Sequence, residues 1–222
     1  SAAQCGPAAP SIAHMWHMPG HIYSRLKRFD DAVFKQEASA RADHAHMIRD
    51  RVLPDQIHNY AHNNEWLIRN LVHLGRRDAA LSLAKNMLEL PRHPKYNAFD
   101  KDGMCSCKYG RLRLLQVLES FEMWDDVIAI SKTMYLEPTE SKEEQGKRWR
   151  MIGLASYHLG EFQEVEKCCE ALEKLLVNFD RSAKKAGRHA AKEKRESLDA
   201  ATEDEKSAET STADNTTDEE EK

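Results

Sequence analysis

Histidine side chains recur at helical spacing in two short stretches of the chain. Three histidines near the N-terminus follow one another at intervals of three and four residues. A second group repeats these intervals in reverse order and ends in a glutamate. The candidate ligands are His14, His17, His21, His58, His62 and Glu65. Residues three and four apart share one face of an α-helix, and imidazole with a carboxylate suits zinc, copper, nickel or iron. One interpretation is therefore a transition-metal site.

The same spacing has a second interpretation that needs no metal. Histidine and glutamate side chains on a helix face also hydrogen-bond to one another and to a bound peptide, as in a polar groove. The two interpretations predict different geometries. A metal needs at least three ligand atoms within about 2 Å of one point, whereas a polar groove does not need its side chains to converge. The sequence leaves both open. We take the groove as the first hypothesis and the metal site as the alternative.

The remaining reactive side chains form no catalytic pattern. The sequence has no phosphate-binding loop and no serine nucleophile elbow. Cys105 and Cys107 have a spacing that suits a redox or metal pair, but this signal has low specificity, and we expect free surface thiols there. Trp66 and Trp149, at helical spacing, are expected in the core. The sequence therefore favours a binding protein over an enzyme.

Charge and cysteine content narrow the class further. Residues 1–179 carry equal numbers of basic and acidic side chains, so their charge gives no reason to expect nucleic acid as a partner. No apolar run approaches the roughly 20 residues that span a bilayer. The five cysteines are odd in number, which favours free thiols and a reducing, cytoplasmic compartment. Because the chain begins with serine, we expect it to belong to a longer protein.

Helical elements must position these residues, and the apolar spacing predicts eight of them. We expect helices over 11–27, 30–47, 56–74, 77–90, 107–122, 125–136, 143–159 and 162–178. Ser11 is the expected N-cap of the first helix, and Pro19 should bend it. Gly75 is the expected stop of the third. Residues 1–10, rich in alanine and proline, are expected to be irregular.

An internal repeat runs through these helices. The turns into every second helix align, and they place Ala32, Ala80, Val127 and Val165 at equivalent positions, 48, 47 and 38 residues apart. The stretch from Trp16 to Tyr23 reads Trp-x2-Pro-Gly-x2-Tyr. It resembles the first helix of a tetratricopeptide repeat, where the pattern is Trp-x2-Leu-Gly-x2-Tyr. The repeat here is longer than the family's roughly 34 residues.

The resemblance implies an all-α fold, an α-solenoid of four antiparallel helix pairs over residues 11–178. In this family the first helices of successive units line a concave face that binds a protein or peptide. The positions carried over to this chain are His14, His17, His21, Arg25, His62, Glu65, Arg69, His73, Tyr109, Gln116, Arg150 and Tyr157. The resemblance therefore implies an interaction module with a groove rich in histidine, arginine and glutamate.

The end of the chain differs in composition from the rest. Residues 179–195 are basic and are expected to extend the last helix. Residues 196–222 hold eleven acidic and two basic side chains and no aromatic residue. Such a composition buries too little apolar surface to order itself, so we expect a disordered acidic tail.

Overall fold

The structure, a computed structural model, describes residues 1–57, 59–95 and 105–179. Within these ranges the chain is all-α and contains no strand, which confirms the all-α part of the predicted fold. The helices are α1 (Ala2–Ala8), α2 (Ala13–Arg25), α3 (Phe29–Asp50), α4 (Tyr60–His73), α5 (Arg77–Glu89), α6 (Ser106–Ser120), α7 (Trp124–Ile130) and α8 (Lys142–His158), with a 3₁₀ helix η1 (Pro54–Gln56) and further helical residues at 162–179. No helix in the described part is both long and apolar enough to cross a membrane.

Contacts divide the chain into two compact units, Ser1–Leu172 and Glu173–Lys222. The division falls a few residues before the predicted domain end at residue 178. In the second unit the described residues, 173–179, are helical. The predicted basic extension and acidic tail lie, apart from residue 179, outside the described residues.

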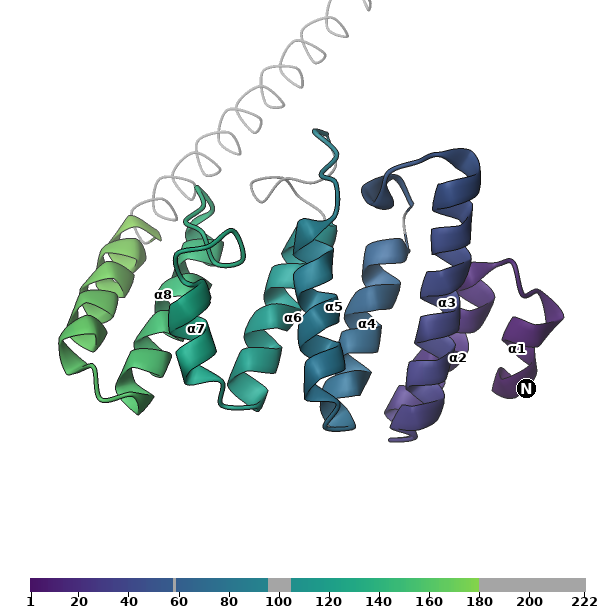
Figure 1. The fold of residues 1–222 in the computed structure, drawn as a ribbon, viewed down its shortest axis with the longest axis horizontal. Helices are drawn as coiled ribbons and strands as arrows, with labels where there is room; N and C mark the ends of the chain where they lie inside the picture. The colour runs from purple at the N-terminus through teal and green to yellow at the C-terminus, as the bar shows by residue number, and fades with distance from the viewer. Residues whose placement is uncertain (58, 96–104, 180–222) are drawn as a thin grey trace, which may run out of the picture. The chain divides into compact units, whose positions relative to one another are not determined.

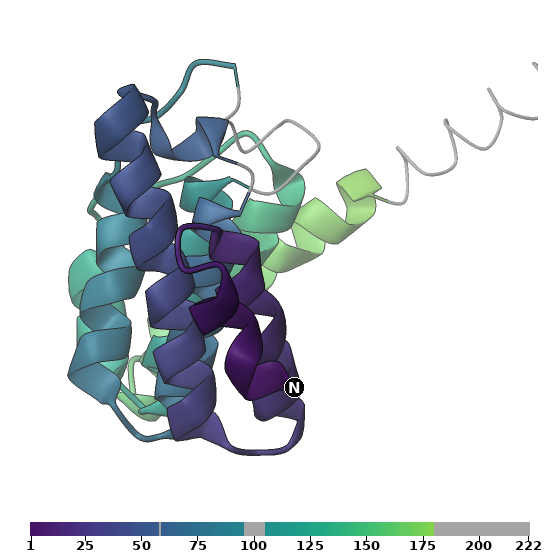
Figure 2. The same ribbon diagram turned by 90° about the vertical axis from the view of Figure 1, so that its right-hand side faces the viewer.

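Within the first unit, α2 to α8 stand in a row in chain order (Figure 1). Each helix packs against the next, and α4 also contacts α6. Viewed from the N-terminal end of the row, α2 and α3 lie side by side in front of the later helices (Figure 2). Neighbours in the chain are thus neighbours in space, as short connections between helices require.

The turns that the repeat aligns share one backbone conformation. The first helix of each predicted pair (α2, α4, α6 and α8) is followed by a residue with positive φ. These residues are Lys27, Gly75, Glu122 and Gly160, with φ of 57°, 70°, 53° and 78°. In every case the next residue donates its backbone N–H to a carbonyl five positions earlier, as Arg28 does to Tyr23. This is the hydrogen bonding of a Schellman C-cap. Two turns lack glycine, so the sequence alone does not reveal the motif at those positions.

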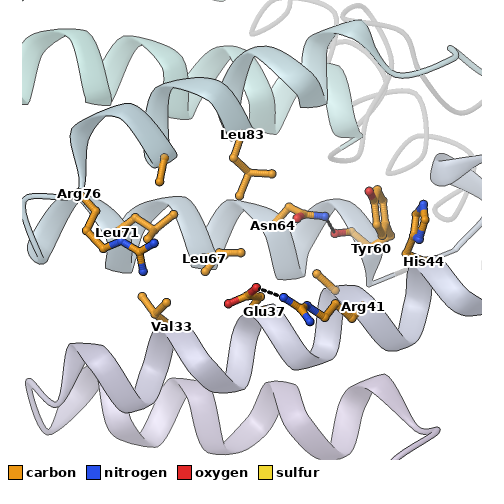
Figure 3. Close-up of a pocket in the computed structure, with 12 residues that line it drawn as sticks. Val33, Glu37, Arg41, His44, Tyr60, Asn64, Leu67, Leu71, Arg76 and Leu83 are labelled. Carbon is orange, nitrogen blue, oxygen red and sulfur yellow. Dashed lines mark hydrogen bonds and ion pairs between the residues drawn. The ribbon is translucent and has the colours of Figure 1, made fainter.

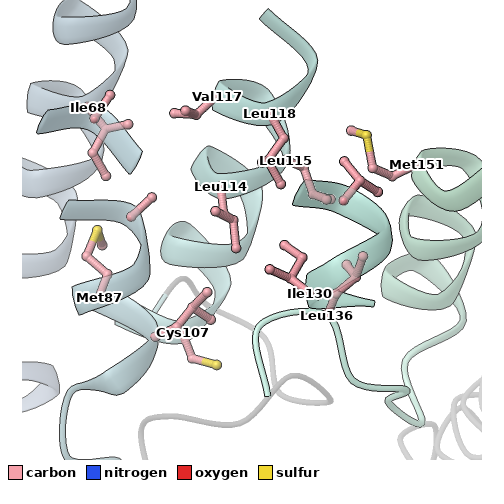
Figure 4. Packing of buried hydrophobic residues seen from close by; sticks show 14 of the residues in the cluster. Ile68, Met87, Cys107, Leu114, Leu115, Val117, Leu118, Ile130, Leu136 and Met151 are labelled. Carbon is pink, nitrogen blue, oxygen red and sulfur yellow. The ribbon is translucent and has the colours of Figure 1, made fainter. Parts of the chain in front are cut away.

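A continuous apolar core runs from α4 to α8 (Figure 4). Its fully buried members include Ile68, Met87 and Leu114, while the repeated small residues Ala80 and Val127 are also fully buried. The α2–α3 pair is different, because polar side chains are buried between its helices. Their hydrogen bonds satisfy groups that would otherwise be costly to bury.

The expectation that residues 1–10 are irregular is wrong, because α1 covers most of them. Alanine favours helix strongly, and α1 packs against α2. Gly6 permits this approach, since a Cβ atom there would meet the ring of Trp16 at 2.3 Å. The predicted cap is also wrong: Ile12, not Ser11, occupies the N-cap of α2. That helix continues through Pro19 to Arg25.

The predicted helix over 125–136 ends early, at Ile130. Two arginines from neighbouring helices hydrogen-bond to carbonyl groups of the segment that follows Ile130. Arg111 donates to the carbonyl oxygens of Tyr135 (3.3 Å) and Glu137 (2.5 Å). Arg148 donates to those of Leu136 (2.8 Å) and Ser131 (3.3 Å). Of these carbonyls only that of Ser131 would be used within a helix reaching residue 136, so the bonds mainly hold this segment against α6 and α8.

Candidate metal centre

Three of the predicted metal ligands converge. His17, His21 and His62 each offer a ring nitrogen, and these atoms lie within 4.8 Å of one another. The Nε2 atoms of His17 and His21 are 2.5 Å apart. The ring centroid of His62 is 4.8 Å from that of His17 and 5.9 Å from that of His21. The cluster joins α2 to α4, so both histidine-containing stretches of the sequence contribute to it.

Helix geometry and close packing explain the positions of the two α2 histidines. His17 and His21 are one turn apart and so share a face of α2. Gly20, between them, lies against Gln36 of α3, where a Cβ atom would meet the Gln36 Nε2 atom at 2.4 Å. The glycine therefore lets α3 approach closely enough for Gln36 to reach His17.

Gln36 orients the His17 ring. Its Oε1 atom lies 3.0 Å from the His17 Nδ1 atom, and both side chains are buried. Because an amide oxygen only accepts hydrogen bonds, this contact requires the proton on Nδ1. The Nε2 lone pair of His17 is then directed at His21. It is placed to accept a hydrogen bond from the His21 Nε2–H group, or to bind a metal ion if His21 takes its other tautomer.

His62 has polar partners on its Nδ1 side. The Tyr109 hydroxyl lies 3.3 Å from this atom and a Glu65 carboxylate oxygen lies 3.6 Å from it. Glu65 is buried and is held by Arg113, whose Nε atom donates to it at 2.6 Å. A carboxylate behind the histidine ring is a common way to fix a metal-binding tautomer. This arrangement would leave the Nε2 atom of His62 as the one that could bind a metal.

The electrostatics keep His17 and His21 neutral. Burial, followed by the charge of His21, lowers the pKa of His17 to about 4. Burial also lowers the pKa of His21, followed by the charges of His62, Arg25 and Arg69. Neutral imidazole is the form that binds metals, so at pH 7 protons do not compete for these two ligands.

Two of the other predicted ligands lie outside the cluster. His14 is exposed, and its ring stacks on that of His17 at 5.9 Å between centroids. Glu65 contacts His62 rather than sharing the convergence point. The sixth predicted ligand, His58, lies outside the described residues. Of the five predicted ligands that the structure describes, three histidines therefore form the cluster.

The predicted groove residues form cross-helix contacts beyond the histidine cluster. Arg113 of α6 bridges Glu65 of α4 and Gln116 of its own helix. Arg150 of α8 pairs with Glu119 of α6 at 2.6 Å. The first helices of successive pairs thus touch one another through polar side chains. These contacts join α4 to α6 and α6 to α8.

Three further groove positions lie apart from these contacts. His73 is exposed and stacks on Phe29 with centroids 4.5 Å apart. Tyr157 is exposed and meets the edge of Phe162. Arg69 lies over the Trp66 ring, 4.6 Å from its centroid.

A cavity of about 370 Å³ lies elsewhere, between α3, α4 and α5 (Figure 3). Val33, Leu67, Leu71 and Leu83 supply apolar lining, and Tyr60 and Asn64 from α4 add polar atoms. Arg41 and Glu37 form an ion pair of 2.5 Å at its edge. None of the twelve predicted groove residues lines this cavity, so the groove hypothesis did not anticipate it.

A buried carboxyl lies beside the cluster. Asp43 of α3 accepts a hydrogen bond of 2.6 Å from the Asn63 side chain, next to His62 in the chain. Both side chains are buried, and burial raises the pKa of Asp43 to about 6. The Oδ1 atom of Asn63 has no hydrogen-bond partner among the described residues. Protonated Asp43 is a potential donor to this amide, which an ionised carboxylate is not.

Asp43→Asn is expected to stabilise the protein at neutral pH. The folded carboxyl binds its proton more tightly than the unfolded one, so wild-type stability falls as pH rises from about 4 to about 6 and stays low above it. The variant lacks this loss. Its free energy of unfolding, relative to that of the wild type, should therefore be up to about 3 kcal/mol higher at pH 8 than at pH 4. Urea unfolding at both pH values measures the gain. Asp30→Asn, at an exposed position of α3, is the control, and an equal gain there would contradict the assignment.

Sequence reasoning missed three residues of the site. Gln36 orients His17, Arg113 holds Glu65, and Trp66 contacts the His21 ring at 4.2 Å rather than lying in the core. Arg113 could have been found, because it lies four residues after Tyr109 and three before Gln116 on the same helix face. Gln36 lies on α3, the second helix of its pair. The expectation that ligand-binding residues come from the first helices therefore does not include it.

The cysteines are free, as predicted, but the expected surface pair is buried. Cys105 and Cys107 lie in the core at the start of α6. Burial raises the pKa of Cys107 to about 12 and also raises that of Cys105. Thiols with such pKa values are poor nucleophiles, so this pair is structural. Cys168 is buried, whereas Cys169 is exposed.

Comparison of the chain with models of known protein families, with curated proteins and with solved structures gives no match. Function must therefore be argued from the geometry of the site.

Proposed function

We propose that this protein binds a transition metal of the zinc class through His17, His21 and His62. The observation that carries the proposal is the convergence of the three ring nitrogens from two helices. Three protein nitrogens with one further position is the ligand pattern of catalytic zinc sites. A structural site would instead close the fourth position with a protein ligand.

The distances suit a metal after a small adjustment. Zinc–nitrogen bonds of about 2.0–2.1 Å at tetrahedral angles place ligand nitrogens roughly 3.3 Å apart. The His17–His21 separation of 2.5 Å is shorter than this, and the whole cluster lies within 4.8 Å. Ring rotations of less than about 1 Å at the nitrogen atoms bridge the difference. Gln36 supplies an outer hydrogen bond behind His17, as such sites use, and a Glu65 carboxylate oxygen lies 3.6 Å from His62 on the side away from the cluster.

The scaffold of this site is proposed to be a tetratricopeptide-like α-solenoid of four helix pairs. The four equivalent turns with the same Schellman hydrogen bonds support a repeated unit. The contacts from α2 to α4, α4 to α6 and α6 to α8 support stacking of the first helices.

A second candidate function is the binding of a peptide or protein along the groove residues. The favouring observation is the polar face that continues from α4 through α6 to α8. The two functions are compatible, since the histidine cluster lies at one end of the same face.

Metal content tests the first proposal directly. Chelator-treated protein is dialysed against buffered Zn²⁺, and bound metal is counted by elemental analysis. We expect one zinc per chain, and none above background for the His17→Ala/His62→Ala double variant. Circular dichroism of the metal-free variant verifies that it is folded. Equal zinc in both proteins, or no zinc in the wild type, contradicts the proposal.

A further inference from the structure

The three histidines bring no negative charge to a bound metal ion. Neutral imidazole leaves a divalent cation with its full charge. Glu65, the carboxylate that contacts His62, already pairs with Arg113 through two of its guanidinium nitrogens. The proposed centre is therefore more cationic than zinc sites that include a carboxylate or thiolate ligand.

Two arginines add to this positive charge. Arg25 lies one turn after His21 on α2, so it projects from the same helix face. The Arg69 guanidinium lies over Trp66, 4.6 Å from the ring centroid, and the His21 ring contacts the same indole at 4.2 Å. Trp66 thus holds Arg69 beside the histidine cluster. The positive charges of Arg25 and Arg69 also contribute to the lowered pKa of His21.

These arginines differ from the others on this face. Arg113 and Arg150 each have a carboxylate partner, Glu65 and Glu119 respectively. Across the residues that the structure describes, no carboxylate lies within ion-pair distance of Arg25 or Arg69. A cationic group with no internal counter-charge is what an anion-binding position requires.

The cluster is also accessible to a ligand. The His62 side chain is 32% exposed, His21 is half-buried, and Arg25 is exposed. By contrast, Gln36 and Glu65, which fix the rings from behind, are buried. The histidines therefore combine a buried, oriented side with a side that faces solvent.

We propose that the fourth coordination position, together with Arg25 and Arg69, binds the carboxylate group of an exogenous ligand. This inference rests on the proposed metal site. One carboxylate oxygen would bind the metal, and the other would accept hydrogen bonds from guanidinium, which suits the paired geometry of that group. Both a small organic acid and the C-terminus of a peptide carry this chemistry. The second source would place a peptide end at one end of the groove.

Cobalt-loaded protein tests the inference. Co²⁺ is added first, and its visible absorption shows whether the metal binds; without that signal the metal proposal itself fails. The loaded protein is then titrated with acetate, with a short peptide that has a free C-terminus, and with the same peptide amidated. We expect acetate or the free peptide to change the cobalt spectrum and the amidated peptide to leave it unchanged. Whichever of acetate and the free peptide binds more tightly identifies the source of the carboxylate.

The arginines are tested by Arg25→Gln/Arg69→Gln. We expect this variant to bind cobalt as the wild type does but to bind the carboxylate at least about tenfold more weakly, as expected for lost charge-assisted hydrogen bonds. Arg150→Gln, on the same face but paired with Glu119, is the matched control and should bind the carboxylate normally. The inference is overturned if cobalt binds but no carboxylate changes its spectrum. It is also overturned if the double variant binds the carboxylate like the wild type.

Discussion

Zinc at a thousand times its dissociation constant is expected to raise the free energy of unfolding of the wild type by about 4 kcal/mol. His21→Ala should lose most of this gain. Replacing a group behind a metal ligand costs about 10–100-fold in affinity, so removal of a ligand itself should cost at least 100-fold. At the same zinc concentration the variant then gains no more than about 1.4 kcal/mol.

His21 is a suitable position because it is only half-buried and its removal leaves the core intact. Urea unfolding with and without zinc measures the two gains. His14→Ala is the control on the same helix, since His14 is exposed and lies outside the cluster. It should keep the full zinc gain. Equal gains in wild type and His21→Ala would show that His21 does not bind the metal.

Leu114→Ala is expected to lower the free energy of unfolding by about 3 kcal/mol. Leu114 is fully buried in the core between α5 and α7 (Figure 4). Truncation removes apolar contacts and leaves a cavity, for which the usual cost is about 2–5 kcal/mol. That is a large share of the stability of an ordinary domain. Thermal or urea unfolding followed by circular dichroism measures the loss.

Leu26→Ala is the control, because it is the same leucine-to-alanine substitution at a position that is 62% exposed. It should cost less than about 1 kcal/mol. If both variants unfold at the same denaturant concentration, Leu114 does not lie in a packed core and the assignment of α6 fails.

Local sequence signals account for most of the helices. Apolar spacing identifies α4 and α5, and Gly75 marks the turn between them. The failures have tertiary causes. The segment after α7 is bonded through its carbonyl groups to Arg111 and Arg148 of other helices, and local periodicity does not contain such contacts. Helix α1 forms where composition alone predicts an irregular segment.

The histidine cluster could be predicted only in part. Periodicity places His17 and His21 on one face, but it treats His58, His62 and Glu65 alike. Which of them meets His17 depends on how far α4 is shifted along α2, and packing sets that shift. Likewise, no local rule indicates that Gln36 reaches His17 from α3, since this contact requires the close approach at Gly20.

Helix α4 carries features of different kinds on different faces. Tyr60 and Asn64 line the cavity of Figure 3, while His62 and Glu65 belong to the histidine cluster. A helix moves as a rigid element, so a displacement of α4 changes both places at once. A molecule in the cavity and a metal at the cluster that favour the same position of α4 would each tighten the binding of the other, and by thermodynamic reciprocity by the same factor. If they favour different positions, each would weaken the other. If the proposed metal site forms, the cavity would be a second place from which its affinity could be changed.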